Sequence, residues 1–301
     1  MTTTRRHLRA FGLTIRSEFE VPELPPAPAE DSATVTLRRA AIEPPPDADP
    51  DQTVYRSRPR ELLLLYDAGT IAIRDGREIR IDPDPAVPAE ILRHLIVGPV
   101  LNFLLYQRGY FVLHASTVEI DGQAVAFVGD SGTGKTTTAT ACLCAGHRVL
   151  SDDVAALDLE GDRPRVVSGY PSIKLDPDLV DQLDVPVGAP QGASPDRDRH
   201  FHRLRHDQPT TPVPLARIYR LEDAPTEEVE PVESSQQVLE LVRNTYTVGL
   251  LDEDETASSN FERCSTLAAS VPVKRLRRRR EIARLPDLVD VVEEDLDGDG
   301  A

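Results

Sequence analysis

The sequence predicts an α/β protein built from two parts, and three observations support this prediction. An apolar stretch, Gln123–Val128, leads through a glycine-rich stretch into a helix-forming stretch, Gly134–Cys144, which is the strand–loop–helix order of an α/β core. Short strand-like stretches bounded by Pro or Gly fill residues 11–95. The length of 301 residues suits two domains. The expected parts are a smaller β-rich N-terminal domain (1–95), a larger domain (96–290) and an acidic disordered tail (291–301).

The N-terminal part is expected to consist of short strands joined by loops rich in Pro and acidic residues. Its strand candidates are Phe11–Ile15, Ala33–Leu37, Glu61–Tyr66 and Thr70–Ile73. Ala89–Gln107 then reads as one long apolar helix. Gly98 and Pro99 inside it predict a kink or a break, because Pro removes a helical hydrogen bond.

The rest of the chain alternates between strand-like and helix-like stretches. The strand candidates are Phe111–His114, Thr117–Ile120, Arg148–Leu150, Val154–Leu157 and Ile218–Leu221. Asp121-Gly122 predicts a hairpin turn, and Ser234–Thr245 predicts a helix. Asp184–Pro214 is expected to be a polar loop. The basic run Lys274–Arg280 is expected to be a solvated helix face that pairs with the acidic tail.

Composition excludes several classes of partner. Lys plus Arg number 34 and Asp plus Glu number 51, which gives a formal charge of −17, so broad binding of nucleic acid or anionic lipid is not expected. No apolar run approaches the length of about 20 residues that crosses a bilayer, so no membrane span is expected. Three cysteines without framework spacing, together with the lack of a signal-peptide pattern, predict free thiols and a cytoplasmic protein.

Residues 129–136 read Gly-Asp-Ser-Gly-Thr-Gly-Lys-Thr and fit the Walker A pattern G-x-x-x-x-G-K-T. Glycines let successive backbone N–H groups curl around a phosphate, and the following helix adds the positive end of its dipole. Lys135 would reach the β- and γ-phosphates, and the Thr136 hydroxyl would be a Mg²⁺ ligand. The candidate nucleotide-binding residues are Gly129, Asp130, Ser131, Gly132, Thr133, Gly134, Lys135, Thr136 and Thr137.

Two adjacent acids, Asp152 and Asp153, follow a short apolar strand after this helix. A Walker B acid stands at such a strand end and binds Mg²⁺ directly or through water. Two acids permit a division of roles, in which one holds the metal and the other accepts a proton from a hydroxyl. His114 ends the strand before the glycine-rich loop. Its imidazole either approaches the γ-phosphate or the acceptor, or belongs to a half-buried strand histidine paired to backbone.

Taken together, these residues resemble the HPr serine kinase family, in which a strand His, a Walker A loop and an Asp pair occur in this order. The resemblance covers about residues 110–157. It implies a P-loop kinase core similar to that of phosphoenolpyruvate carboxykinases, and transfer of a phosphoryl group from ATP, with Mg²⁺, to a Ser hydroxyl. It makes Lys135 and Thr136 nucleotide and metal contacts, Asp152 the metal ligand, Asp153 the base and His114 an active-site partner. The reverse assignment of the two acids stays open.

The chain departs from the longer members of that family. The later signature rich in Arg and Gly is not found, and residues 1–95 do not resemble their regulatory domain. The layout is closer to shorter HPr-kinase-like proteins of peptide pathways, which share Phe11-Gly-Leu-Thr, Gly169-Tyr170-Pro171 and Arg284–Leu288. The expected partner is therefore a protein or precursor peptide that bears a Ser. The kinases it resembles form assemblies, so a homo-oligomer is also among the expected partners.

Three functions compete at this stage. They are a serine kinase acting on a protein or peptide, a P-loop ATPase that works as a regulatory switch without an acceptor, and an ATP-binding module whose catalysis has decayed. His114 and the paired acids favour the first, because a simple ATPase more often shows a single acid and a separate sensor.

Two weaker signals accompany these motifs. Lys174 is expected to lie on the surface, with a catalytic or phosphate contact as the alternative. The Arg- and His-rich stretch Asp196–His206 is expected to be solvated and not to bind metal. The alternative for its arginines is closure over phosphates.

Overall fold

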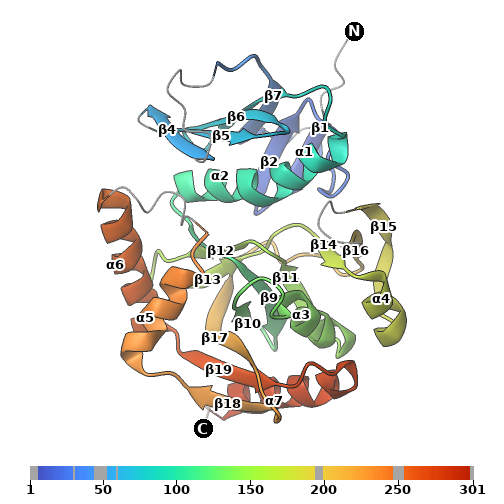
Figure 1. The fold of residues 1–301 in the computed structure, drawn as a ribbon, viewed down its shortest axis with the longest axis vertical. Helices are drawn as coiled ribbons and strands as arrows, with labels where there is room; N and C mark the ends of the chain where they lie inside the picture. The colour runs from blue at the N-terminus through green and yellow to red at the C-terminus, as the bar shows by residue number, and fades with distance from the viewer. Residues whose placement is uncertain are drawn as a thin grey trace.

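The computed structural model describes residues 6–29, 31–43, 53–58, 60–193, 199–246 and 254–298. The chain is a mixed α/β protein with three β-sheets, which confirms the predicted fold class. Figure 1 shows a sheet near the N-terminus, a long helical segment beneath it, and a second sheet with flanking helices that extends to the C-terminal end.

The N-terminal sheet has seven strands in the order β1-β2-β3-β7-β6-β5-β4. The strands are β1 Arg6–Ala10, β2 Leu13–Ser17, β3 Val35–Arg39, β4 Val54–Arg58, β5 Glu61–Tyr66, β6 Gly69–Arg74 and β7 Glu78–Pro83. The pairs β2–β3 and β3–β7 are parallel and the other pairs are antiparallel. The predicted strands correspond to β2, β3, β5 and β6, and the sequence reading missed the other three.

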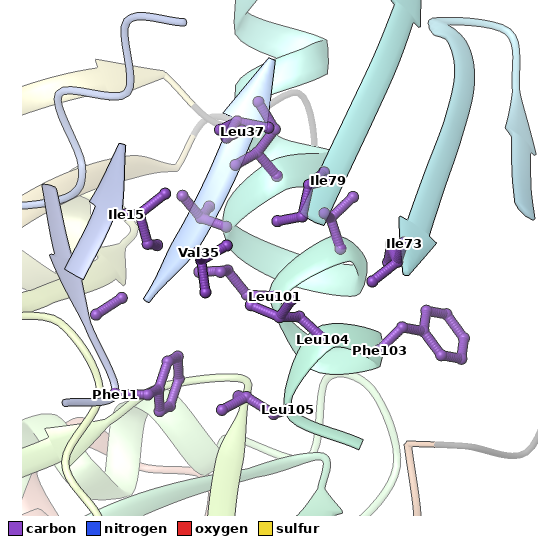
Figure 2. Packing of buried hydrophobic residues seen from close by; sticks show 14 of the residues in the cluster. Phe11, Ile15, Val35, Leu37, Ile73, Ile79, Leu101, Phe103, Leu104 and Leu105 are labelled. Atoms are coloured by element: carbon purple, nitrogen blue, oxygen red, sulfur yellow. The ribbon is translucent and has the colours of Figure 1, made fainter. Parts of the chain in front are cut away.

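One face of this sheet is buried against a helical segment composed of α1 Ala89–Leu95, η1 Ile96–Val100 and α2 Leu101–Gln107. In Figure 2 Leu37 and Ile79 of the sheet point toward Leu101 and Leu104 of the helix. Side chains alternate between the two faces of a strand, so β7 buries only Ile79 and Ile81. The segment is kinked as predicted, because Gly98 has non-helical angles (φ −100°, ψ −105°) and Pro99 follows it.

The same helical segment contradicts the expectation that no apolar run approaches the length of a membrane span. Ala89–Gln107 has 19 residues and a mean hydropathy of 1.3, so by length and composition it is able to cross a membrane. Half of this stretch is buried inside the structure, where it packs against the N-terminal sheet. Its apolar character is therefore accounted for by its place in a protein core. The segment also crosses the boundary predicted at residues 95 and 96, so the division into domains stays a prediction.

The second sheet has nine strands, with the main order β11-β9-β10-β17-β13-β12-β8, while β19 pairs with β17 and β18 pairs with β19. The strands are β8 Phe111–Leu113, β9 Ala115–Ile120, β10 Gln123–Val128, β11 Arg148–Ser151, β12 Ala155–Asp158, β13 Arg165–Val167, β17 Val213–Asp223, β18 Glu228–Pro231 and β19 Val273–Arg278. The parallel pairs β10–β17 and β17–β19 form its middle. The predicted hairpin turn at Asp121 and Gly122 joins β9 to β10, and both residues have positive φ.

Helices flank this sheet (Figure 1). They are α3 Lys135–Cys144, α4 Pro177–Leu183, α5 Ser234–Arg243, α6 Asp254–Ser270, the short 3₁₀ turn η3 Ile282–Arg284 and α7 Leu285–Asp297. Helix α7 corrects the expectation of a disordered tail, because it continues to Asp297 with Val292 fully buried. It is amphipathic: its Leu and Val residues pack into the same cluster as α3, and Asp290, Glu294 and Asp297 are exposed.

Two further expectations are corrected by β pairing. Part of the predicted loop Asp184–Pro214 forms β15 Val187–Ala193 and β16 His200–Leu204, which make a third sheet with β14 Ser172–Leu175. The basic run Lys274–Arg280 is mostly strand β19 and not a helix. Its arginines pair with glutamates of the neighbouring strands, such as Arg277 with Glu228 at 2.8 Å, and Lys274 pairs with Asp295 of α7 at 2.7 Å.

Candidate active site

The Gly-rich loop, residues 129–134, connects β10 to the start of α3. Gly129, Gly132 and Gly134 have φ of 143°, 83° and 90°, a region that side-chain-bearing residues rarely adopt. A Cβ on Gly134 would also collide with the guanidinium of Arg278. The glycines are therefore required for the backbone path itself.

Two residues far away in the sequence fasten this loop. The Asn244 side chain accepts a hydrogen bond from the Gly129 N–H at 2.9 Å. The guanidinium of Arg278 donates to the Thr133 carbonyl, and within the loop the Thr133 hydroxyl donates to the Asp130 carbonyl at 2.8 Å. Sequence reasoning gave Asn244 no role and expected Arg278 in a solvated basic run, because both residues meet the loop only through the fold.

Lys135 lies at the first position of α3 and is only 6% exposed. Its Nζ donates to the carbonyls of Gly129 at 2.7 Å and Asp130 at 3.2 Å. Burial lowers the pKa of this amine, against the opposing effect of the nearby carboxylates. The amine is thus folded back over the loop and lies among the groups predicted to bind phosphate.

Asp152 follows β11 directly and joins the loop side of the site. Its Oδ1 accepts hydrogen bonds from the Thr136 hydroxyl at 2.9 Å and from the Ser116 hydroxyl at 2.6 Å. Burial raises the pKa of Asp152, and the adjacent charge of Asp153 raises it further. A buried carboxylate beside two hydroxyls is a set of oxygen donors, which is the kind of set that Mg²⁺ prefers.

Asp153 is held differently, although it is the next residue. Its backbone has a positive φ of 66°, which is rare for a residue other than Gly and is concentrated at functional sites. Its Oδ2 accepts a hydrogen bond from Lys174 Nζ at 2.9 Å. Burial alone would raise the pKa of Asp153, but the charges of Lys174, His114 and Lys135 bring it below its ordinary value. The expectation that Lys174 lies on the surface was wrong, because strand β14 places it against this acid.

His114 supports Asp153 from the other side. Its Nδ1 lies 3.1 Å from the Asp153 carbonyl oxygen, so Nδ1–H donates to that oxygen. Burial, with the charge of Lys135, lowers the pKa of the imidazole. The edge of the ring faces Tyr246 at 5.6 Å, and the His114 N–H donates to the Asn244 carbonyl at 2.8 Å. His114 is thus paired to backbone, as the second alternative expected, and it also lines the cleft, while its approach to a γ-phosphate or an acceptor stays a prediction.

Most of the predicted site residues line one cleft of about 720 Å³, whereas Gly129, Asp130 and Thr133 are not among its lining residues. The end of the cleft at the Gly-rich loop contains Lys135, Thr136, Asp152 and Asp153. The opposite wall comes from the kinked helical segment and from the third sheet, through His94, Gly98, Pro99, Tyr170 and Phe201. The structure therefore brings the predicted residues together, and it adds walls that no motif indicated.

The remaining sequence signals lie outside this arrangement, except for Arg199. Among the residues that the structure describes, no group of three or more His, Cys, Asp and Glu is arranged to hold a metal. His202 and His206 lie next to separate backbone carbonyls, those of Gly188 and Val149. Of the arginines in Asp196–His206, Arg199 lines the cleft, while Arg197 falls outside the described residues.

Comparison with known proteins relates part of the chain to one family. No family model matches it. A curated HPr kinase/phosphorylase of Chlorobium phaeobacteroides (strain BS1) is 34% identical over 124 residues, which are 36% of this chain and 35% of the relative. The chain thus matches about a third of the length of that relative. This sequence match confirms the resemblance to the HPr kinase family.

A solved structure, the Hpr(Ser) kinase/phosphatase of Coxiella burnetii, is similar with a TM-score of 0.32 and 15% identity. The similarity covers 63% of this chain and 99% of that one. Similarity at this level does not establish a shared fold, so the relation to the family rests on the sequence match.

Proposed function

We propose that this chain is an HPr-kinase-like enzyme that transfers the γ-phosphoryl group of ATP, with Mg²⁺, to a Ser hydroxyl of a protein or peptide. One observation supports this most strongly. Two adjacent acids lie in one cleft with different partners, Asp152 bonded to Thr136 at the Gly-rich loop and Asp153 bonded to Lys174. One acid is thereby suited to a metal and the other to a proton.

The Gly-rich loop would bind the triphosphate. Gly134, the N-cap residue of α3, has no side chain that could accept a hydrogen bond from the first N–H groups of the helix. These N–H groups and the positive end of the helix dipole therefore suit a phosphate oxygen. Lys135, already at the loop, would exchange its carbonyl partners for phosphate oxygens, which are stronger acceptors for an ammonium group.

The hydroxyl of Thr136 and the carboxylate of Asp152 would hold Mg²⁺. Mg²⁺ is commonly bound by one or two carboxylates together with substrate phosphates, so a site without three acidic or His ligands fits it. When bound, the ion neutralises negative charge on the phosphate oxygens. Burial and the neighbouring charge of Asp153 raise the pKa of Asp152, and a bound cation would favour its ionised form.

Asp153 would accept the proton of the acceptor. The Ser oxygen attacks the γ-phosphorus, the bond to the bridging oxygen of ADP breaks, and the hydroxyl proton moves to the Asp153 carboxylate. The lowered pKa keeps Asp153 ionised at neutral pH, so it is ready to accept. His114 holds the Asp153 backbone in its strained conformation through the Nδ1–H bond.

In this proposal the nine-stranded sheet with α3 is the P-loop kinase core, similar to that of phosphoenolpyruvate carboxykinases, and the N-terminal sheet is the smaller β-rich domain. We place the reaction in the cytoplasm, because all three cysteines are free and Cys144 is exposed.

Label transfer from [γ-³²P]ATP with Mg²⁺ to Ser-containing acceptor peptides tests the proposal. We expect acceptor-dependent label in the wild type and none in Lys135→Ala, while Lys274→Ala, which alters a lysine outside the cleft, transfers label normally. Release of free phosphate that ignores the acceptor would instead indicate an ATPase. Tight ATP binding with neither product would indicate a module without catalysis.

The division of roles between the acids has its own test. Asp153→Asn is expected to lose transfer and to keep its affinity for MgATP, measured by calorimetry. If the affinity collapses in Asp153→Asn and survives in Asp152→Asn, the two roles are reversed.

A further inference from the structure

The cleft continues past Asp153 to the kinked helix, along a chain of contacts. Lys174, which is bonded to Asp153, places its ammonium 5.4 Å from the centre of the Phe201 ring. The Phe201 ring lies 6.4 Å from the ring of His94 on α1. The cleft thus has two ends. The loop end is at Thr136, and the helix end is where Phe201 of β16 faces His94 of α1. Asp152 and Asp153 lie between these ends.

At the helix end, Tyr170, which precedes β14, connects the kinked helical segment with the turn between β1 and β2. The Tyr170 hydroxyl donates to the Val97 carbonyl at 3.4 Å, and the Tyr170 ring packs edge-on against Phe11 at 6.2 Å. Gly98 and Pro99 line the cleft at the kink. Interruptions of this kind in a helix are frequent at functional sites.

In-line transfer requires the acceptor oxygen to approach the γ-phosphorus from the side opposite ADP, within reach of the base. The loop end would be taken by phosphates, and Arg199 lines the same cleft. Past Asp153 the lining includes Pro99, Tyr170 and Phe201, together with His94, whose ring faces Phe201, and Lys174, which is already paired with Asp153. This end is therefore suited to an apolar group.

We propose that the helix end of the cleft binds the side chain next to the acceptor Ser, and that it selects an apolar residue at that position. The inference rests on the proposed function and adds to it a substrate class, which is a peptide segment with Leu, Phe or a similar side chain adjacent to Ser. The kinked helical segment would thereby help to determine which acceptor peptides react. It packs against the N-terminal sheet, whereas the reaction itself takes place at the Gly-rich loop.

Peptide libraries with the sequences X-Ser and Ser-X, in which X is Ala, Leu, Phe, Asp or Lys and the other positions are mixed, provide the test. We expect kcat/KM with Leu or Phe at one neighbouring position to exceed that with Asp by about tenfold or more, the usual range for an apolar pocket. Phe201→Ala enlarges the helix end and should shift the preference toward larger side chains. Gly98→Ala narrows it and should shift the preference toward smaller ones.

Gly98→Ala keeps the test independent of folding, because a Cβ on Gly98 meets no atom within 4 Å, whereas Phe201 is buried. Phe261→Ala is the matched control, since Phe261 is 54% exposed on α6 and does not line the cleft. It should leave the preference unchanged. The KM for ATP should stay the same in all three variants.

Equal labelling for every X, or a preference that neither cleft variant changes, would overturn the inference while leaving the kinase intact. A rise in the KM for ATP in Phe201→Ala, with an unaltered peptide preference, would overturn it in favour of the nucleotide base as occupant. If ATP binds and no peptide is labelled, the proposed function itself is overturned, and the inference with it.

Discussion

Replacing Lys174 by Met removes the cation from the Asp153 ion pair and keeps a side chain of similar length. The two charged groups are 2.9 Å apart, and their side chains are 10% and 33% exposed. An opposite charge at this distance shifts a carboxyl pKa by about 1–3 units, or about 1.4–4 kcal/mol. Because Asp153 is about a third exposed and solvent screens the pair, we expect the lower half of that range.

The sign of the effect follows from the role of Asp153 as a base. In the wild type its pKa is lowered, so activity falls only when the pH drops below the ordinary range of an Asp. In Lys174→Met the pKa rises, and the acid limb of kcat/KM against pH should move upward by about 1–2 units. The same lowered pKa stabilises the folded wild type above the unfolded-state pKa. That contribution is lost as the pH falls through the folded-state pKa.

The assay measures label transfer as a function of pH from 4 to 9. It compares the wild type with Lys174→Met, Lys174→Arg and Lys274→Met. Lys174→Arg keeps a cation and should keep the acid limb close to that of the wild type. Lys274→Met removes a lysine from a similar ion pair, with Asp295 at 2.7 Å, away from the cleft, and should not move the limb. An acid limb that stays in place in Lys174→Met would refute Asp153 as the base.

The remaining predictions concern the loop and the thiols. Asn244→Ala leaves the Gly129 N–H without its acceptor, at a cost of about 1–3 kcal/mol, and should weaken nucleotide binding in calorimetry; an affinity equal to that of the wild type would contradict this. Gly134→Ala should weaken nucleotide binding, because the positive φ is strained for Ala and the Cβ displaces the Arg278 guanidinium that fastens Thr133, while Gly122→Ala, also at positive φ but with open space around it, should bind normally; equal nucleotide affinities in the two variants would contradict this. In thiol titration at pH 8 the exposed Cys144 should react first, and the two buried cysteines, whose pKa values are raised to about 12 and about 11, should react only after unfolding; three fast thiols would contradict the fold.

The sequence predicted the parts of the site that are local in the chain. Strand β10, the Gly-rich loop and α3 follow one another in the chain. The apolar pattern of the strand, the glycines and the start of the helix could therefore be recognised together from the sequence. The kink at Gly98 and Pro99 was equally local. Asp152 and Asp153 could be placed because they end a short apolar strand next to this unit.

What the sequence did not show depends on pairing between distant strands. The residues of β19 are mostly basic, and their strand conformation is stabilised by β17 and β18, whose acidic side chains pair with the arginines. Strands β15 and β16 contain Gly, Pro and His, which resemble a loop until β14 is placed beside them. Lys174 enters the site only through that sheet, and Phe201 follows for the same reason.

A crystal structure with Mg²⁺ and a non-hydrolysable ATP analogue tests the central assignment most directly. We expect the triphosphate in the Gly-rich loop, the γ-phosphate beside Lys135, and the ion bound to Thr136 and to Asp152, directly or through water. Asp153 should face the γ-phosphorus from the side of Lys174. A triphosphate bound elsewhere, or an Asp153 carboxylate turned away from the γ-phosphate, would contradict the account.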